Sequence, residues 1–377
     1  MKIVIAPDSY KESLTAMEVA TEIEAGFREI YPDAEYVRLP MADGGEGTVA
    51  AMVAATGGRV IEKEVTGPLG EPVKAFYGIT GDGKTAIIEM AAASGLVLVP
   101  THLRNPTKTT TFGTGELIKA ALDAGICHLI IGIGGSATND GGAGMLQALG
   151  VKLLDQSGCE IGFGGESLAK LCSINISTLD QRLNHCQIDV ACDVSNPLTG
   201  PTGASAVFGS QKGATPEMVA QLDTNLSHYA ALIHRDLGVD VNSTPGAGAA
   251  GGMGAALLAF LNAHLRKGAE IVMEAIGLET AVQDADLVIT GEGRIDSQTI
   301  HGKTPIGVAK IAKLYGKPVI GIAGSLSSDV GAVYDHGIDA VFSVLRQVGT
   351  IEDALKSAPE NLRIASRNIA AALKLLH

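Results

Sequence analysis

The sequence has few cysteines and few basic residues, and both shortages argue against whole classes of protein. The five cysteines are odd in number, and none forms a C-x-x-C pair. A disulfide framework or a zinc module is therefore not expected. We expect reduced thiols in a cytoplasmic protein instead. Lysine and arginine number 28 against 41 aspartates and glutamates, for a formal net charge of −13. Such an acidic chain argues against a nucleic-acid scaffold, which needs a basic face.

Long apolar runs and a hydrolase motif are also missing. No apolar stretch is long enough to span a bilayer. The first residues, MKIVIAPDSYKES, predict a strand rather than a signal peptide. The G-x-S-x-G nucleophile elbow is absent, so no Ser-His-Asp constellation can be assembled around it. We expect small-molecule partners, with neither a nucleic acid nor a membrane, and a homo-oligomer is compatible with the sequence.

Glycine, in contrast, is abundant. The chain has 48 glycines among 377 residues, and they occur in short clusters without a period. Clustered glycine marks backbone that turns sharply or approaches a ligand closely. Hydrophobic residues make up 46% of the chain, which is enough for a sizeable core, and the length suits two domains.

The N-terminal segment predicts alternating strands and helices. The strands are expected over 2–6 and 36–39, and the helices over 15–30 and 47–56. Thr15 and Glu18 have the spacing of a capping box at the start of the first helix. This alternation is typical of the beginning of a parallel sheet.

The middle of the chain follows another pattern, and the C-terminal third returns to alternation. Residues 59–90 predict antiparallel strands with hairpin turns, and residues 151–210 predict irregular structure. Further helices are expected over 115–124, 143–149, 216–237 and 249–263, and further strands over 128–133 and 188–192. The last third predicts strands over 287–290, 318–323 and 340–344 and helices over 305–315, 330–336 and 351–376.

These patterns predict an α/β protein with a discontinuous domain. Residues 1–57 and 277–377 would form a Rossmann/flavodoxin-like domain around one parallel sheet. Residues 58–276 would form an inserted mixed α/β domain. Ligands usually bind where two such domains face each other, so the sequence predicts an active site in the interdomain cleft.

Two stretches match well-known nucleotide motifs in an unsuitable context. Residues 78–85 match the Walker A pattern, but a strand is expected after them where a P-loop needs a helix. Residues 246–251 match G-x-G-x-x-G, but a turn precedes them where a dinucleotide fold needs a buried strand. An anion site before the following helix and close packing of small residues are both compatible with 246–251.

The loop over 132–142 is a stronger candidate. It follows a buried strand, precedes a short helix and concentrates glycines, hydroxyls, an amide and a carboxylate. A tight turn alone needs only one or two such residues. A triphosphate or a metal ion is the natural ligand of such a loop. If it binds a nucleotide, the expected contacts are Gly134, Gly135, Ser136, Thr138 and Asn139.

Four other segments place acids directly after expected strands. They are residues 7–11, 43–46, 193–197 and 291–296. Each alone could be an ordinary turn. In open α/β sheets, however, ligands bind beyond the carboxyl ends of the strands, so the four together indicate a functional site.

Seven stretches together resemble the bacterial glycerate kinase family of the two-domain type. They are IAPDSYKESLTA, ADGGEGTV, IGIGGSATNDGGAGMLQALG, ACDVSNPL, GAGAAGGMGAAL, VITGEGRIDSQTIHGK and GIAGSL. The resemblance extends from Met1 to the final helix. It implies ATP and Mg²⁺ as co-substrates, D-glycerate as acceptor and 2-phosphoglycerate as product.

The chemistry of phosphoryl transfer suggests a role for each strand-end residue. A carboxylate must orient the acceptor hydroxyl, and cations must offset the phosphate charge. We assign the first role to Asp193, on the expectation that its apolar surroundings bury it. Lys11 is the second catalytic candidate, a cation near the glycerate carboxylate. The predicted substrate-binding residues are Asp8, Ser9, Arg294 and Asn196, and the predicted Mg²⁺ ligands are Glu292, Asp296 and Asp43.

Other functions remain open at this point. The kinase could phosphorylate another small hydroxy acid or the 3-hydroxyl of glycerate. A non-catalytic protein that binds a small acid or a nucleotide is the alternative from another class.

Overall fold

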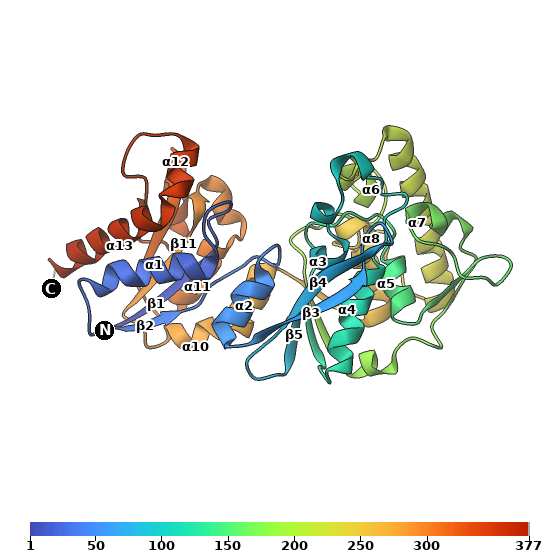
Figure 1. Cartoon of the computed structure of the whole chain (residues 1–377), viewed down its shortest axis with the longest axis horizontal. Coiled ribbons are helices and arrows are strands. Elements are labelled where there is room, and N and C mark those ends of the chain that lie inside the picture. The colour runs from blue at the N-terminus through green and yellow to red at the C-terminus, as the bar shows by residue number, and fades with distance from the viewer. Residues whose placement is uncertain (376–377) are drawn as a thin grey trace. The chain divides into compact units, whose positions relative to one another are not determined.

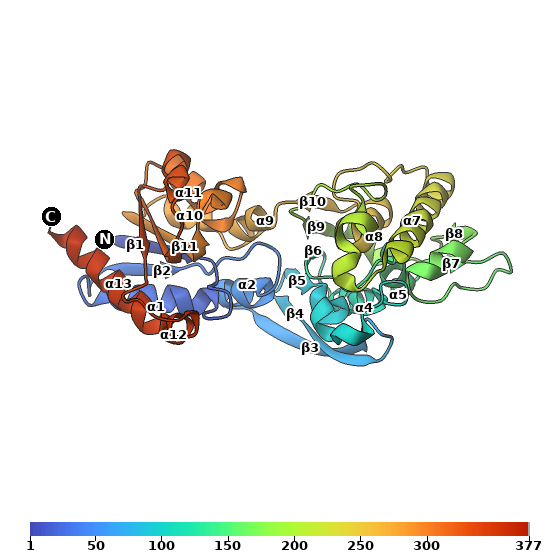
Figure 2. The same cartoon turned by 90° about the horizontal axis from the view of Figure 1, so that it is seen from above.

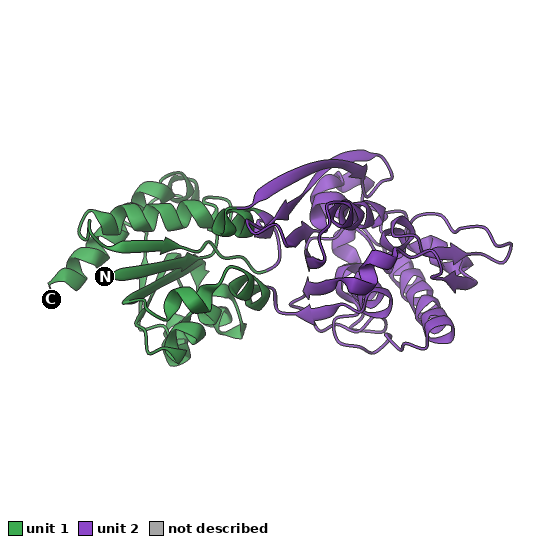
Figure 3. Cartoon of the chain, turned by 90° about the horizontal axis from the view of Figure 1, so that it is seen from below, with its two compact units in different colours: residues 1–43, 50–57, 269–377 green, residues 44–49, 58–268 purple. Residues whose placement is uncertain are grey.

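The computed structural model describes residues 1–375. The chain forms two compact units. Unit 1 contains residues 1–43, 50–57 and 269–377, and unit 2 contains residues 44–49 and 58–268 (Figure 3). Within residues 1–375, no helix combines the length and the apolar character needed to cross a membrane.

Unit 1 is built around a five-stranded parallel sheet of order β2-β1-β11-β12-β13. The strands are β1 (Lys2–Pro7), β2 (Glu35–Arg38), β11 (Leu287–Ile295), β12 (Val319–Leu326) and β13 (Ala340–Ser343). This is the flavodoxin-like order, in which the direction of strand progression reverses between β1 and β11. The expected fold class is confirmed, including the return of the C-terminal third to the N-terminal sheet.

Helices cover both faces of this sheet, as Figure 2 shows. They are α1 (Ala16–Arg28), α12 (Ile351–Lys356) and α13 (Ala358–Lys374) on one face and α9 (Gly268–Ala275), α10 (Leu278–Val282) and α11 (Thr304–Leu314) on the other. α1 and α13 lie side by side (Figure 1) and so close that a Cβ on Gly26 would lie 2.3 Å from the carbonyl oxygen of Arg363.

The start of α1 is as predicted. Thr15 Oγ1 accepts the backbone N–H of Glu18 at 3.3 Å, and Glu18 Oε2 accepts the backbone N–H of Thr15 at 2.8 Å. Two other expectations for unit 1 are wrong. The single final helix is divided into α12 and α13 because Pro359 lies in the first turn of α13 and cannot continue a preceding helix. Residues 330–336 form a 3₁₀ helix instead of an α-helix. Leu376, the predicted end, is outside the described residues.

Unit 2 contains a six-stranded sheet of order β10-β9-β6-β5-β4-β3. The strands are β3 (Arg59–Thr66), β4 (Pro72–Ile79), β5 (Thr85–Glu89), β6 (His128–Gly132), β9 (Gln187–Ala191) and β10 (His264–Arg266). The hairpin predicted over 59–90 is confirmed, since β3, β4 and β5 pair antiparallel. β5 also pairs parallel with β6, so four neighbouring strands have their carboxyl ends at one edge.

The other elements of unit 2 pack around that sheet or extend from it. They are α3 (Ala91–Ser94), α4 (Phe112–Asp123), α5 (Ala143–Ala148), α6 (Ala204–Phe208), α7 (Pro216–Leu237), α8 (Ala249–Leu261) and the hairpin β7 (Lys152–Leu154) and β8 (Ser173–Asn175). The helix α2 (Thr48–Thr56) begins with residues 48 and 49 of unit 2 and otherwise belongs to unit 1. α7 has the predicted bounds, and residues 151–210 contain short strands where irregular structure was expected.

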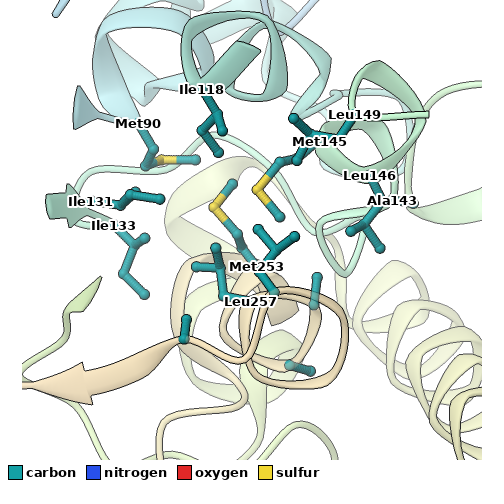
Figure 4. Packing of buried hydrophobic residues seen from close by; sticks show 14 of the residues in the cluster. Met90, Ile118, Ile131, Ile133, Ala143, Met145, Leu146, Leu149, Met253 and Leu257 are labelled. Carbon is teal, nitrogen blue, oxygen red and sulfur yellow. The ribbon is translucent and has the colours of Figure 1, made fainter. Parts of the chain in front are cut away.

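The core of unit 2 joins strands and helices that are far apart in the sequence. Met145 of α5 and Met253 of α8 point toward one another, and Met90, Ile118 and Ile131 lie beside them (Figure 4). Met145, Met253, Met90 and Ile118 are fully buried. The glycine-rich start of α8 therefore packs directly behind the segment that follows β6.

Candidate active site

In unit 1, the polar side chains gather at the carboxyl ends of β1 and β11. These two strands are neighbours, and the strand order reverses between them. In doubly wound sheets this reversal is where ligands bind. Asp8 directly follows β1, and Glu292 lies in the last part of β11. The structure thus brings together two strand-end acids that are 284 residues apart in the sequence.

Asp8 is held firmly in place. Its Oδ1 accepts the backbone N–H of Ser9 at 2.6 Å, and its Oδ2 accepts the hydroxyl of Thr304 at 2.8 Å. Burial raises the pKa of Asp8, these hydrogen bonds lower it, and the charge of Asp43 raises it further. Asp8 therefore sits in an electrostatic environment that favours a cation or a hydrogen-bond donor beside it.

Glu292 has a similar environment. Its Oε1 accepts the hydroxyl of Thr299 at 2.6 Å, and its Oε2 lies 3.3 Å from Lys303 Nζ. Burial raises the pKa of Glu292, and the negative charge of Asp8 adds to the increase. The two carboxylates thus repel each other across the switch point, and a bound cation would relieve that repulsion.

Of the three predicted metal ligands, Glu292 and Asp296 are linked through the hydroxyl of Thr299, which donates to Glu292 and accepts the backbone N–H of Asp296 at 3.2 Å. Asp296 Oδ1 accepts the backbone N–H of Gln298 at 2.9 Å, and its Oδ2 lies 3.3 Å from Arg294 Nε. Asp43 is exposed at the end of the segment that follows β2. Throughout the described chain, no three His, Cys, Asp or Glu side chains form a group that could hold a metal ion. Mg²⁺ commonly takes only one or two carboxylates, with substrate phosphates and water supplying the other ligands, so the acid pair at the switch point fits such an ion.

The two predicted cations of unit 1 lie on the surface beside this acid pair, and Ser9 is half-buried next to Asp8. Lys11 is exposed in the turn after β1, where Glu12 adopts a left-handed φ of 63°. That turn is anchored by Tyr10, whose hydroxyl donates to the carbonyl of Ile322 at 2.9 Å. The side chain of Arg294 is 65% exposed. Both cations are therefore accessible to an anionic substrate.

In unit 2, the segment after β6 is the main feature. We call residues 134–139 the glycine-serine loop. Gly134 and Gly135 are exposed, and Gly135 has a φ of 72°. In the described part of the chain, the backbone N–H groups of Gly134, Gly135 and Ser136 donate to no other residue. Consecutive unpaired N–H groups at a strand end are suited to an anion.

The other predicted residues of this loop lie inside the unit. Thr138 and Asn139 are fully buried, and Ser136 is 7% exposed. Asn139 Nδ2 donates to Ser205 Oγ at 3.2 Å. The exposed part of the loop is therefore confined to the two glycines.

Asp140, which directly follows the glycine-serine loop, connects it to the rest of unit 2. Its Oδ2 accepts the backbone N–H and the hydroxyl of Thr111 at 2.9 and 2.8 Å, and the N–H of Gly144 at 3.3 Å. Its Oδ1 accepts the N–H of Gly142 at 3.1 Å. The carboxylate thus ties the starts of α4 and α5 together.

Asp193 and Asn196 follow β9 on the same sheet edge as the glycine-serine loop. Asp193 Oδ1 accepts the backbone N–H of Gly268, which follows β10, at 3.2 Å. The expectation that Asp193 is buried is wrong, because the chain has already left the sheet interior at Cys192 and the side chain is exposed. Asn196 Nδ2 donates to the carbonyl of Thr202 at 2.8 Å, so its amide also shapes its own loop.

The two motif matches are explained by the fold. Residues 78–85 include the ends of β4 and β5, and residues 80–84 form the expected turn between them, in which the N–H of Gly83 donates to the Thr80 carbonyl at 2.9 Å. Residues 246–251 lead into α8, whose first turn is distorted at 250–252 by positive φ angles. A Cβ on Gly251 would lie 2.0 Å from the carbonyl oxygen of Thr138. Close packing therefore accounts for these glycines.

Sequence reasoning missed several polar residues at these two places. Lys212 and Glu89 are buried in unit 2, and Lys303 and Thr304 contact the acid pair of unit 1. The only sequence signal for the latter two is the stretch VITGEGRIDSQTIHGK, which ends at Lys303 and directly precedes Thr304. Nothing in the sequence links Lys212 to a loop 74 residues away.

The comparisons with known proteins agree with one another. The family model described as "Glycerate kinase family" matches residues 3–374. This chain belongs to the glycerate kinase family. A protein of Escherichia coli (strain K12) named glycerate 2-kinase is 66% identical over 100% of this chain and 98% of its own length. A glycerate kinase of Bacillus subtilis (strain 168) is 64% identical over the same shares of the two chains.

A solved structure gives the same result. A crystal structure described as glycerate kinase 2 from Salmonella typhimurium LT2 has a TM-score of 0.93 and 67% identity, over 100% of this chain and 98% of that one. The family expected from the sequence is confirmed, and so is the expectation of a phosphotransferase, a glycerate kinase.

Proposed function

We propose that this glycerate kinase transfers the terminal phosphoryl group of ATP to the 2-hydroxyl of D-glycerate, with Mg²⁺ as cofactor. The 66% identity to a protein named glycerate 2-kinase supports the position of transfer. The unpaired N–H groups of the glycine-serine loop support the binding of phosphates in unit 2. The proposal that a nucleotide donates the phosphoryl group depends on these unpaired N–H groups.

Each unit contributes residues whose chemistry suits one part of the reaction. Gly134 and Gly135 offer backbone N–H groups to the phosphates. Asp193, exposed on the same sheet edge, is proposed to orient the glycerate hydroxyl. In unit 1, Asp8 and Glu292 are the carboxylates proposed to face Mg²⁺, which offsets phosphate charge when bound. Asp43 and Asp296 remain proposed ligands of the same ion.

The anionic substrate also needs cations. Lys11 and Arg294 are exposed beside the acid pair of unit 1 and are proposed to bind the glycerate carboxylate together with Ser9. Asn196, which belongs to unit 2, remains a proposed contact of the substrate. Pairing of Arg294 with Asp296 keeps its guanidinium close to the carboxyl end of β11.

The activity itself is tested on the purified protein with ATP, Mg²⁺ and D-glycerate. We expect glycerate-dependent ADP release in a coupled assay and a product whose ³¹P NMR spectrum is that of 2-phosphoglycerate. A product spectrum of 3-phosphoglycerate would contradict the position of transfer. Nucleotide binding without turnover would contradict the proposal as a whole and favour a sensing protein.

Lys11→Gln is expected to raise the KM for D-glycerate roughly 10- to 100-fold, because it removes a charge-assisted contact to the substrate carboxylate. The KM for ATP should change by less than about threefold, as expected for a cation that contacts only the acid. Steady-state kinetics with each substrate varied in turn measures both values. Lys310→Gln, which changes an exposed lysine on α11 of the same unit, is the matched control. A larger effect on ATP than on glycerate would assign Lys11 to the phosphates.

A further inference from the structure

Lys212 is a buried lysine that the proposed function has not used. It ends the short 3₁₀ helix over residues 210–212 and is 1% exposed. Gly213 follows with a φ of 91°, and a Cβ there would lie 2.3 Å from the carbonyl of Arg104. The backbone beside Lys212 is thus fixed by close packing. Burial of an ammonium group is costly unless specific partners compensate it.

The partners of Lys212 are both in the glycine-serine loop. Its Nζ donates to Ser136 Oγ and to the carbonyl oxygen of Thr138, each at 2.7 Å. These two residues flank Ala137, whose N–H donates to the Ser94 carbonyl at 2.9 Å. The lysine therefore holds both ends of a three-residue segment from the interior of unit 2. The exposed glycines come directly before that segment.

Stability alone does not explain a buried lysine at this position. Burial lowers the pKa of Lys212 to about 7, and the negative charge of Asp140 only partly opposes this effect. The buried phenol of Tyr229 also lies in the field of Asp140, and burial raises its pKa, so it stays neutral. A neutral donor could satisfy the two acceptors at a lower desolvation cost. This suggests that the positive charge has a function in the glycine-serine loop.

We propose that Lys212 is a positioning residue for the nucleotide. It fixes the Ser136–Thr138 segment so that the N–H groups of Gly134, Gly135 and Ser136 stay oriented for phosphate, and its ammonium adds positive potential behind them. This inference rests on the proposed function, in which the phosphates of ATP lie on the glycine-serine loop. Lys212 does not contact substrate in this role.

The test replaces Lys212 with methionine, which has a similar volume and no donor, and with glutamine, which keeps a donor. We expect Lys212→Met to raise the KM for ATP roughly 10- to 100-fold while kcat and the KM for glycerate change by less than about threefold. Lys212→Gln should show a smaller increase. Lys170→Met is the matched control, because Lys170 also ends a 3₁₀ helix of unit 2 but is exposed.

Two results would overturn the inference. One is an unchanged KM for ATP in folded Lys212→Met, and the other is an equal loss in all kinetic constants, which a purely structural lysine predicts. Wild-type activity is measured first, so that failure of the proposed function is recognised separately.

A measurement on the wild type covers the case in which neither variant folds. The terminal phosphate of ATP also titrates in the neutral range, as phosphate monoesters do, so the KM is expressed for the fully ionised nucleotide. This KM is then expected to rise from about pH 6 to about pH 8, as the ammonium of Lys212 loses its proton through its pKa of about 7. A constant KM for ATP over this range would contradict the proposed role of the charge.

Discussion

Replacement of Asp193 by asparagine is expected to lower kcat by a factor of roughly 10²–10⁴, the usual contribution of a group that accepts a proton in the transition state. Asparagine keeps the side-chain oxygen that can accept the N–H of Gly268, so the loop after β9 should retain its structure. The substitution removes the charge and the basicity of the side chain. The KM for ATP should therefore remain within about threefold of the wild-type value, because binding of the nucleotide is assigned to other residues.

The control for this variant is Asp240→Asn. Asp240 is also exposed in unit 2, and its Oδ1 likewise accepts a backbone N–H, from Asn242 at 3.1 Å. It should have full activity. An Asp193→Asn enzyme within a few-fold of the wild type would end the assignment.

The sequence predicts the sheet of unit 1 well because each of its signals is local. The capping box of Thr15 and Glu18 and the alternation of strand and helix depend on residues near one another. Each strand-end acid is likewise recognised from its position directly after its own predicted strand, and the carboxyl ends of parallel strands share one edge of the sheet. Asp8 and Glu292 could therefore be expected together although they are far apart in the chain.

The features that could not be predicted depend on contacts between distant segments. No local sequence pattern predicts that Gly251 packs against Thr138 or that Lys212 donates a hydrogen bond to the same residue. Side-chain direction is likewise decided by packing. Thr138 and Asn139 look like ligands in the sequence, yet the turn that exposes Gly134 and Gly135 directs them into the core.

Replacement of Gly251 by alanine is expected to reduce the free energy of unfolding by roughly 3–5 kcal/mol. The residue has a φ of 67°, in the left-handed region, which costs any other residue about 1–2 kcal/mol. The larger part comes from overlap, because the new Cβ would lie 2.0 Å from the Thr138 carbonyl oxygen and 2.7 Å from Asn139 Cα. Chemical denaturation followed by circular dichroism measures the loss.

The same substitution should also weaken ATP binding. Thr138 can move away from the alanine only by disturbing its hydrogen bond to Lys212, and with it the glycine-serine loop. The KM for ATP is therefore expected to rise more than the KM for glycerate, in the fraction of Gly251→Ala that remains folded.

Gly83→Ala is a demanding control for this prediction. Gly83 also belongs to unit 2 and has a similar φ of 72°, but nothing lies within 4 Å of the position of its Cβ. Gly83→Ala should lower the free energy of unfolding only by the conformational cost of about 1–2 kcal/mol and leave the KM for ATP unchanged. Because Gly83 belongs to the Walker A match, an increased KM for ATP in this variant would restore residues 78–85 as the phosphate site. Equal losses of stability in the two variants would mean that the contact between Gly251 and Thr138 does not constrain the loop.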